Sequence, residues 1–587
     1  MIDVITAEVI RDYMETTARE IFLTLIRSAV SIMFNEAYDG AAGVFYYDGE
    51  KVSLISRANA VPVHLFGSIS SVEACVRYFK GDLNDGDIIL VSDPYHGGTH
   101  IPDYTMMKPV FFEGKPIFFP CVRGHFLDVG TPYPGSVNPA ATTIHQEGFR
   151  FPPLKLFEKG ELRRDVWKLL TANTRLVQTY EGDLNAMLGS CKVGERRIKK
   201  LVEKYGFEVV LDGVNYTMDY SETKFRNEIR KWPDGTYTGT SSLDTDYRGD
   251  EDINVDVAVT IKGDEIEVDF AGSHAQTPGL INSVPGNTNS YVYMGFMALC
   301  PDIVVNSGFF RPIHVKLPEN SVVNASSPAP TGINTIQIGA DIGEAIMQAL
   351  SKLAPEKAGT ISLDLCIFGA IGVDPRYNSF FVAYDYNGSP ISAGATYGTD
   401  GWGAWSTLMS GLRMESMEQM ETKYPLMYLH GEYATDSSAP GQWRGAPAYH
   451  MKRTPYGVEQ PIMHDFWMQK GEGYALKGYA GGQPGVGNYA IVYDGTPQSR
   501  RVEGGHFLGP VEEGEIVFMQ SGGGGGWGSS LERDPRSVLE DVVNELVSIE
   551  AAAQDYGVVI DKANVSIDLP KTEELRNKMR NLEKATA

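Results

Sequence analysis

Helical and strand periodicity occupy separate blocks of this 587-residue chain, and this separation constrains its fold most strongly. Residues 6–33 carry apolar side chains at helical spacing, with Thr6 as a candidate N-cap, and residues 155–231 are mostly helical with few breakers. Elsewhere, short apolar runs end at Gly, Pro or Asn turns, as expected for strands. Strands and helices grouped in this way predict an α+β fold, mixed and multi-domain, that is β-rich apart from these helices.

A chain of this length exceeds one ordinary hydrophobic core, so several domains are expected. The first predicted segment, 1–154, is an N-terminal helix with a β-rich region, and the second, 155–231, is helical. The third, 232–360, is a β-rich region with one helix, and the fourth, 361–587, is a β region rich in Gly and aromatic residues. The last segment also contains PRSVLEDVVNELVSIEAAAQDYG, which we predict as a C-terminal helix that ends at Gly557.

The charge of the chain limits its partners. The formal net charge is -24, which opposes binding to nucleic acid and to anionic membranes. No apolar run is long enough to span a membrane, and the charged N-terminus lacks a signal-peptide core. The cysteines are odd in number and form no CxxC motif, which favours reduced thiols and a cytoplasmic location. We therefore expect a small-molecule substrate or a protein partner.

Two clusters of histidine and acid lie where predicted strands end, within the β-rich part of segment 1–154. SDPYHGGTHIPD contains His100 and Asp103, and RGHFLDVG in the next hairpin contains His125 and Asp128. Adjacent strands can bring these ends together. Two neutral imidazoles and one carboxylate, with positions left open, suit a catalytic divalent cation. The remaining acid, or Asp93, could orient an imidazole.

An alternative assigns these histidines no ligand role. His96 and His100 could cap turns around the Gly-Gly pair, and His125 could be a buried core histidine. His145 and Glu147 form another polar cluster in TTIHQEGFRFPP, which could line the same cleft or be a polar loop. Both alternatives stay open at the level of the sequence.

The glycine-rich motifs do not predict a nucleotide site. GGGGGWG has no GxxxxGK[ST] pattern and no following lysine, so a tight hinge or an interface loop is expected there. GGQPGVGN does not match GxGxxG, and no GxSxG nucleophile motif is present. The chain therefore shows no ATP site of its own.

Several long motifs, in this order, resemble the hydantoinase B/oxoprolinase family along nearly the whole chain. They are SDPYHGGTHIPDYTMMKPVF, RGHFLDVGTPYPGSV, IHQEGFRFPPLKL, LTANTR, GDLNAMLGSCKVGERRI, ETKYPLMYLHGEYATDSSAPGQWRGAPA, GGGGGWGSSLERDP and VSIEAAAQDYGVVID. The resemblance implies the large, non-ATP-binding subunit of a heteromeric ATP-dependent enzyme, in a heterotetramer or larger assembly. A hydantoinase A-type partner with an actin-like fold would bind ATP and phosphorylate the substrate's carbonyl oxygen.

The resemblance also implies site residues. Metal-bearing members take ligands from HxxD and from a later histidine, which carries over to His100, Asp103 and His125 here, for manganese or zinc. Asp128 or Glu147 would then be the general base. Three further residues are candidates to line the pocket or orient the ligands: Asp93, His96 and His145.

The implied reaction is the hydrolysis of a cyclic amide such as a hydantoin, oxoproline or lactam. The alternative is an ATP- and bicarbonate-dependent ketone carboxylase of the acetone or acetophenone type, and a third possibility is a scaffold subunit without chemistry. Many hydrolase members read AHHAD where this chain reads GHFLD, so Phe126 replaces a second histidine. The Gly-His pair of this motif is closer to what carboxylase members show. The chain length, by contrast, is usual for hydantoinase-type subunits.

Overall fold

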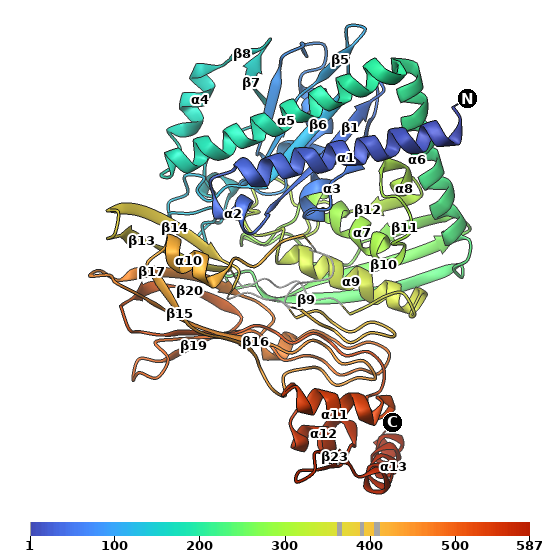
Figure 1. Cartoon of the computed structure of the whole chain (residues 1–587), viewed down its shortest axis with the longest axis vertical. Coiled ribbons are helices and arrows are strands. Elements are labelled where there is room, and N and C mark those ends of the chain that lie inside the picture. The colour runs from blue at the N-terminus through green and yellow to red at the C-terminus, as the bar shows by residue number, and fades with distance from the viewer. Residues whose placement is uncertain (1, 361–366, 388–391, 404–410, 587) are drawn as a thin grey trace.

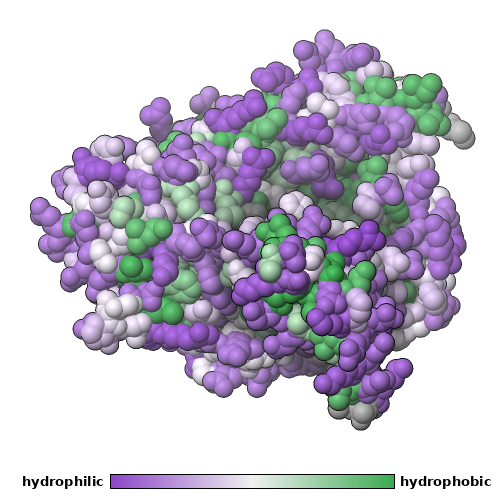
Figure 2. Space-filling model, turned by 60° about the horizontal axis from the view of Figure 1, so that its bottom comes forward, coloured by the Kyte–Doolittle hydropathy of each residue, from purple (hydrophilic) through white to green (hydrophobic). Residues whose placement is uncertain are grey.

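The computed structural model describes residues 2–360, 367–387, 392–403 and 411–586. It has the predicted mixed α+β architecture: an eight-stranded sheet, two four-stranded sheets, one five-stranded sheet, and a small unit at the C-terminal end (Figure 1). Within these described ranges, no helix is both long and apolar enough to cross a membrane. The face that Figure 2 shows is mostly hydrophilic, with hydrophobic residues in several separate groups.

The eight-stranded sheet carries the predicted hairpins. Its order is β2-β1-β6-β4-β3-β7-β8, with β5 also paired to β6. Its strands are β1 (Gly40–Tyr47), β2 (Val52–Arg57), β3 (Ile88–Val91), β4 (Asp103–Met107), β5 (Val110–Phe112), β6 (Lys115–His125), β7 (Leu154–Glu158) and β8 (Glu161–Leu162). Gly49, between β1 and β2, and Gly114, between β5 and β6, have positive φ angles, which glycine adopts without strain in a tight turn.

Helices cover both faces of this sheet (Figure 1). They are α1 (Val4–Ser28), α2 (Ile32–Asn35), α3 (Pro62–Tyr78), α4 (Arg164–Thr171), α5 (Val177–Tyr205) and α6 (Phe207–Ile229). α1 and α5 pack together on one face, and α3 packs on the other. Side chains alternate along β6, so Arg123 faces α3, whereas a Cβ on Gly124 would meet Phe34 on the opposite face. This alternation decides which residues can reach the site described below.

A four-stranded sheet and its helices adjoin α3. The sheet has the order β12-β11-β10-β9, and α9 packs on it while α7 contacts both α9 and α3. The elements are β9 (Gly235–Thr245), β10 (Glu251–Lys262), β11 (Glu265–Asp269), α7 (Pro285–Leu299), α8 (Ser307–Phe310), β12 (Ile313–Lys316) and α9 (Ile338–Leu353). One continuous hydrophobic core runs through these layers, from Ile10 to Leu353 and beyond.

The C-terminal part contains two sheets and a glycine-rich layer. The sheets have the orders β14-β13-β17-β20 and β15-β16-β21-β18-β19. Their elements are β13 (Ile367–Asp374), β14 (Ser379–Asp385), α10 (Met417–Lys423), β15 (Leu426–Tyr433), β16 (Tyr449–Pro455), β17 (Ile462–Met468), β18 (Tyr489–Val492), β19 (Arg500–Val502), β20 (Gly505–Val511) and β21 (Val517–Gln520).

The GGGGG segment at 522–526 is neither a hinge nor an exposed loop. It is buried, and its backbone is hydrogen-bonded to neighbouring segments: the N–H of Gly524 donates to Ala446, that of Gly526 donates to Gln483, and Gly525 accepts from Ala395. Backbones can approach this closely only where no Cβ intervenes. The glycines therefore build a packed layer, which corrects the expectation of a hinge or interface loop.

Three predicted helix limits need correction. The first helix begins earlier, because Asp3 rather than Thr6 is its cap: its carboxylate accepts from the N–H of Thr6 at 2.9 Å. Residues 154–162 form strands β7 and β8 instead of opening the helical region. The C-terminal helix divides into two, since Ser548 caps a new helix, although that helix does end at Gly557. These pieces are α11 (Pro535–Val543) and α12 (Ile549–Tyr556), followed by β22 (Ile560–Asp561), β23 (Ser566–Ile567) and α13 (Leu569–Thr586). The division into four segments stays a prediction.

Candidate metal centre

The register of two strands brings the predicted ligands together. Asp103 opens β4 and His125 closes β6, and these two residues pair directly across the antiparallel ladder. His100 precedes β4 by three residues, in the loop that follows β3. His125 lies on the α3 face of the sheet because it shares the alternation of Arg123. The three side chains thus meet at one end of the sheet, as the adjacency of the hairpins predicted.

One carboxylate oxygen lies between two imidazole nitrogens. Asp103 Oδ1 is 2.7 Å from His100 Nε2 and 3.1 Å from His125 Nδ1. Among the described residues, His100, Asp103 and His125 form the group whose ligand atoms lie close enough together to hold a metal ion. Asp103 is fully buried. Burial alone would raise the pKa of its carboxyl, but His100 and His64 hold that pKa well below its usual value.

The backbone determines how His100 presents its nitrogens. His100 Nδ1 lies 2.7 Å from the carbonyl oxygen of Gly332, which can only accept, so Nδ1 carries the proton. In the neutral ring, Nε2 is then a bare lone pair; it is buried 2.7 Å from Asp103 Oδ1, in a geometry that is not a hydrogen bond. Burial lowers the pKa of this imidazole, which favours the neutral form. A lone pair held towards a carboxylate in this way is typical of a metal ligand.

Sequence reasoning missed the residues on the other side of Asp103. His64, in α3, lies between two acids: its Nδ1 is 3.0 Å from Asp103 Oδ2 and its Nε2 is 2.6 Å from Asp39 Oδ1. Burial would lower the pKa of His64, but these carboxylates raise it to about 9. Arg123 Nη2 also approaches Asp103 Oδ2, at 3.3 Å, and donates to Thr99 Oγ1. The second oxygen of Asp103 is therefore held by cations, which leaves Oδ1 facing the two histidines.

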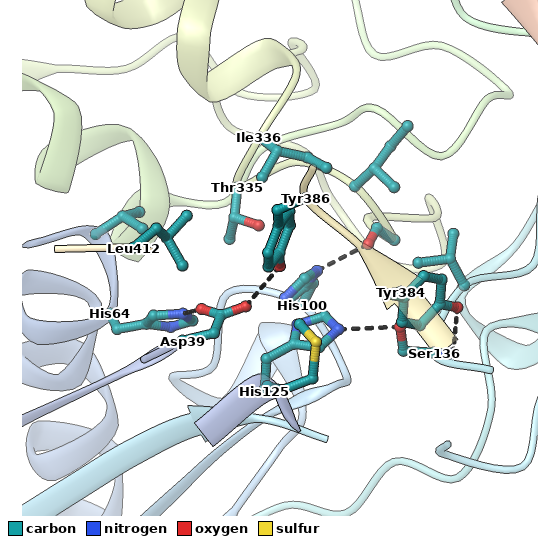
Figure 3. Close-up of a pocket in the computed structure, with 15 residues that line it drawn as sticks. Asp39, His64, His100, His125, Ser136, Thr335, Ile336, Tyr384, Tyr386 and Leu412 are labelled. Carbon is teal, nitrogen blue, oxygen red and sulfur yellow. Dashed lines mark hydrogen bonds and ion pairs between the residues drawn. The ribbon is translucent and has the colours of Figure 1, made fainter. Parts of the chain in front are cut away.

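An enclosed cavity of about 30 Å³ adjoins this cluster (Figure 3). Its wall includes both candidate histidine ligands and several residues with direct contacts to one another. His125 Nε2 is 2.9 Å from Ser136 Oγ, and the hydroxyl of Tyr386 donates to Asp39 Oδ2 at 3.0 Å. The remaining lining residues are Met33, Val63, His64, His100, Val137, Gly332, Ile333, Thr335, Ile336, Tyr384 and Leu412.

Asp128 is not placed as a general base. It is buried and does not line the cavity. Its carboxylate accepts from Arg175 Nη1 at 2.8 Å, from the N–H of Arg175 at 2.5 Å and from the N–H of Gly135 at 3.2 Å. Both oxygens are occupied by these contacts, so Asp128 fixes the start of α5 to the loop after β6. These contacts do not extend to the cavity, and the catalytic role of Asp128 stays a prediction.

Glu147 also lies outside the cavity, but it supports the wall. Its carboxylate accepts from the N–H of Thr331 at 2.8 Å and from the N–H of Gly332 at 2.7 Å. Burial raises the pKa of Glu147 to about 8, against the lowering effect of these hydrogen bonds. Because Gly332 is the acceptor for His100, these hydrogen bonds place Glu147 where it can position His100, and its role as a general base stays a prediction.

The other three candidates lie away from the cavity wall. Asp93 is buried and accepts from the N–H of Tyr95 and from Arg150 Nη1, each at 2.9 Å. His96 is half exposed, with its Nδ1 3.1 Å from Asp93 Oδ2. His145 is exposed on a short helical turn. Asp93 and His96 therefore shape the loop that carries His100, and His145 does not join the same cleft.

Replacement of Glu147 by glutamine tests its positioning role. One acceptor oxygen becomes an NH2 group, so two hydrogen-bond donors, this NH2 and the N–H of Thr331, face each other. We expect the backbone at residues 331 and 332 to shift away, which displaces the Gly332 carbonyl that accepts from His100. We expect kcat/KM of the complete enzyme to fall by about 10- to 100-fold, as for residues that orient metal ligands. Thr331→Val is the matched control, because it removes only a 3.4 Å hydroxyl contact with the same carboxylate. Equal activity of Glu147→Gln and wild type would show that Glu147 does not position His100.

The fold and the buried cluster define a class of protein: a mixed α+β chain with metal-ligating side chain types at the wall of an enclosed cavity. Comparison with known proteins gives the family. The chain belongs to the hydantoinase B/oxoprolinase family, which it matches over residues 3–530.

Relatives align along almost the whole chain. It is 36% identical to the beta subunit of the caprolactamase of Pseudomonas jessenii, over 95% of this chain and 97% of the relative. It is 29% identical to the B-type subunit of a putative D-/L-hydantoinase of Pseudomonas sp. (strain NS671), over 98% of each. The crystal structure of the ATP-dependent caprolactamase from P. jessenii superposes with a TM-score of 0.90 at 33% identity, over 98% of this chain and 100% of that one. A nucleotide-free acetone carboxylase structure has the same fold, with a TM-score of 0.90 at 18% identity, over 99% of this chain and 84% of that one.

Proposed function

We propose that this chain is one subunit of an ATP-dependent heteromeric enzyme, and that this subunit opens the ring of a cyclic amide. A hydantoinase A-type partner would bind ATP and phosphorylate the carbonyl oxygen of the amide. Support comes from the relatives, which are named as the beta subunit of a caprolactamase and the B-type subunit of a hydantoinase, and from the absence of a nucleotide motif in this sequence. The observation that carries the proposal is the buried His100, Asp103 and His125 cluster beside an enclosed cavity.

The cluster fits a divalent cation, either manganese or zinc. The fit rests on the buried lone pair at Nε2 of His100 and on Nδ1 of His125, which both lie close to Oδ1 of Asp103. Two imidazoles and one carboxylate are a ligand set for both ions. When bound, the cation would supply Lewis acidity, which lowers the pKa of water towards neutrality.

The residues of this chain would prepare the reaction in three ways. The Gly332 carbonyl fixes the tautomer of His100, and the Ser136 hydroxyl holds the outer nitrogen of His125, so both imidazoles keep a fixed orientation. The apolar part of the wall excludes bulk water and so protects the activated carbonyl. Asp39 lines the cavity with both of its oxygens engaged, by His64 Nε2 at 2.6 Å and by the Tyr386 hydroxyl at 3.0 Å, so it holds these two side chains in place. The assignment of Asp128 or Glu147 as the general base stays a prediction.

The carboxylase alternative drew on GHFLD in place of AHHAD, in which Phe126 replaces a histidine, and the fold places Phe126 away from the cavity. Its ring stacks on Tyr104 at 4.3 Å between centroids and meets Phe34 edge-on at 5.6 Å, on the face opposite to His125. A histidine at position 126 would therefore project into the aromatic core rather than towards the three ligands. The substitution does not indicate the reaction type.

Product analysis of the enzyme purified with its A-type partner tests the proposal. ATP would be supplied with a hydantoin, caprolactam, acetone or acetophenone and 13C-labelled bicarbonate. We expect ADP together with the ring-opened acid, and no label in a new carbon–carbon bond. A labelled keto acid would establish the carboxylase instead. Unchanged activity of a His100→Ala complex would support the scaffold alternative.

A further inference from the structure

One hydroxyl group on the cavity wall is left without a partner. Thr335 is buried and lines the cavity, and its Oγ1 has no hydrogen-bond partner among the described residues. Figure 3 shows this oxygen turned towards Tyr386, another lining residue. A buried hydroxyl that forms no hydrogen bond is unfavourable, so a ligand that supplies the missing partner gains affinity at this position.

The other polar side chains in the described part of the wall already have partners. Asp39 contacts His64 and Tyr386, His100 contacts the Gly332 carbonyl, and Ser136 contacts His125 through its hydroxyl and Tyr384 through its N–H. A substrate can bond to these groups only by sharing or replacing a partner that is already present. Thr335 differs from them because its full hydrogen-bonding capacity is left for a ligand.

The backbone around Thr335 is fixed relative to the ligand cluster. Thr335 belongs to the segment before α9, whereas the cluster comes from the eight-stranded sheet and its loops. Asn334 Nδ2 donates to the carbonyl of Thr99, the residue before His100, at 2.8 Å. The hydroxyl of Tyr291 in α7 donates to the carbonyl of Thr335 itself. These bonds hold the free hydroxyl in a constant position relative to the loop of His100, as a substrate-binding group requires.

The ring nitrogen of a cyclic amide matches such a hydroxyl. This nitrogen is bonded directly to the reacting carbonyl carbon, so a substrate that presents the carbon to the cluster also brings the nitrogen into the cavity. A hydroxyl can accept from the N–H of the amide, and it can donate to the bare nitrogen of the O-phosphorylated imidate. A ketone of the same ring size has a CH2 group at this position, which forms neither bond and leaves the hydroxyl unpaired.

We propose that Thr335 binds the ring nitrogen of the substrate and thereby makes the site selective for a cyclic amide over a ketone of the same ring size. The inference rests on the proposed function and deepens it, because it names the side chain that recognises the amide group. It gives Thr335 no part in holding the cation.

Two substitutions test this assignment in the enzyme with its ATPase partner. Thr335→Val keeps the shape of the side chain but removes the hydroxyl, whereas Thr335→Ser keeps the hydroxyl and is the matched control. With caprolactam, or with hydantoin if wild type opens only that ring, we expect kcat/KM to fall about 10- to 100-fold in Thr335→Val. Thr335→Ser should stay within about threefold of wild type. Metal content and thermal unfolding temperature should match wild type in both variants.

Cycloheptanone is the matched ketone, with the ring size of caprolactam and no N–H. Because it cannot use the hydroxyl, its inhibition of ring opening should be the same in wild type and Thr335→Val. Weaker inhibition of Thr335→Val, in proportion to the loss of kcat/KM for caprolactam, would mean that the hydroxyl does not distinguish an amide from a ketone, and would overturn the inference.

Each other result has a distinct meaning. Equal kcat/KM of wild type and Thr335→Val would overturn the inference while leaving the proposed function intact. An equal loss in Thr335→Val and Thr335→Ser would show that the hydroxyl is not the group that matters, and would also overturn it. Failure of wild type to open any cyclic amide would overturn the proposed function together with this inference.

Discussion

Replacement of His100 by alanine is expected to reduce ATP-dependent ring opening by more than about 100-fold and to remove bound metal from the chain. The imidazole provides one of three ligands, and the Lewis acidity of a bound cation is worth several kcal/mol in the transition state. The measurement is kcat/KM of the two-subunit enzyme, with metal content read by elemental analysis of the same sample.

His96→Ala is the matched control for this variant. His96 belongs to the same loop but is half exposed, and the ion pair that the structure gives it is with Asp93. We expect it to keep near wild-type activity and metal content. The thermal unfolding temperature of both variants should be measured, so that loss of the site is separated from loss of the fold. A folded His100→Ala enzyme that retains activity would contradict the assignment of the site.

Replacement of Gly445 by alanine is expected to destabilise the C-terminal part by about 3 kcal/mol or more. A Cβ at this position would overlap the carbonyl oxygen of Gly524, which belongs to the neighbouring backbone and cannot rotate away. Overpacking of this kind forces backbone shifts throughout the glycine-rich layer. The measurement is thermal or denaturant unfolding of the purified chain.

Gly473→Ala controls for the substitution itself. A Cβ at Gly473 meets no atom within 4 Å, and neither glycine has φ in the left-handed region. The control should therefore unfold at almost the wild-type temperature. If Gly445→Ala and Gly473→Ala were equally stable, the layer would not be the tightly packed element described here.

Local patterns predicted the parts of the site that a single supersecondary unit builds. Asp103 opens one strand and His125 closes its neighbour, so strand periodicity and turn residues indicated that they could lie together. The same kind of local signal predicted that a C-terminal helix ends at Gly557, where φ is positive. Phe126 shows the limit of motif comparison, because the alternation of the strand directs it away from the cavity.

Residues distant in the sequence could not be found in this way. His64 is a single histidine in α3, and Asp39 is a single acid before a strand, so neither has a motif. Gly332 acts through its backbone carbonyl, which leaves no trace in residue type. Glu147 and Asp128 were assigned as bases from their proximity to histidines, whereas their tertiary contacts with Thr331 and Arg175 have no local signal in the sequence.

The predicted helix limits were wrong for a related reason. Periodicity continues across Asn544 to Ser548, and only the capping of a new helix by Ser548 reveals the break. In the glycine-rich layer, composition suggested mobility, but burial between other backbones gives the glycines a packing role.

Metal titration of the two-subunit enzyme tests the central claim most directly. The enzyme would be stripped with a chelator, and manganese or zinc would be added back while ring opening of caprolactam and bound metal are measured together. We predict that activity rises in proportion to bound metal, reaches its maximum at one cation per copy of this chain, and does not return in His100→Ala. Full activity of an enzyme with far less than one cation per chain would contradict a metal-dependent site at His100, Asp103 and His125.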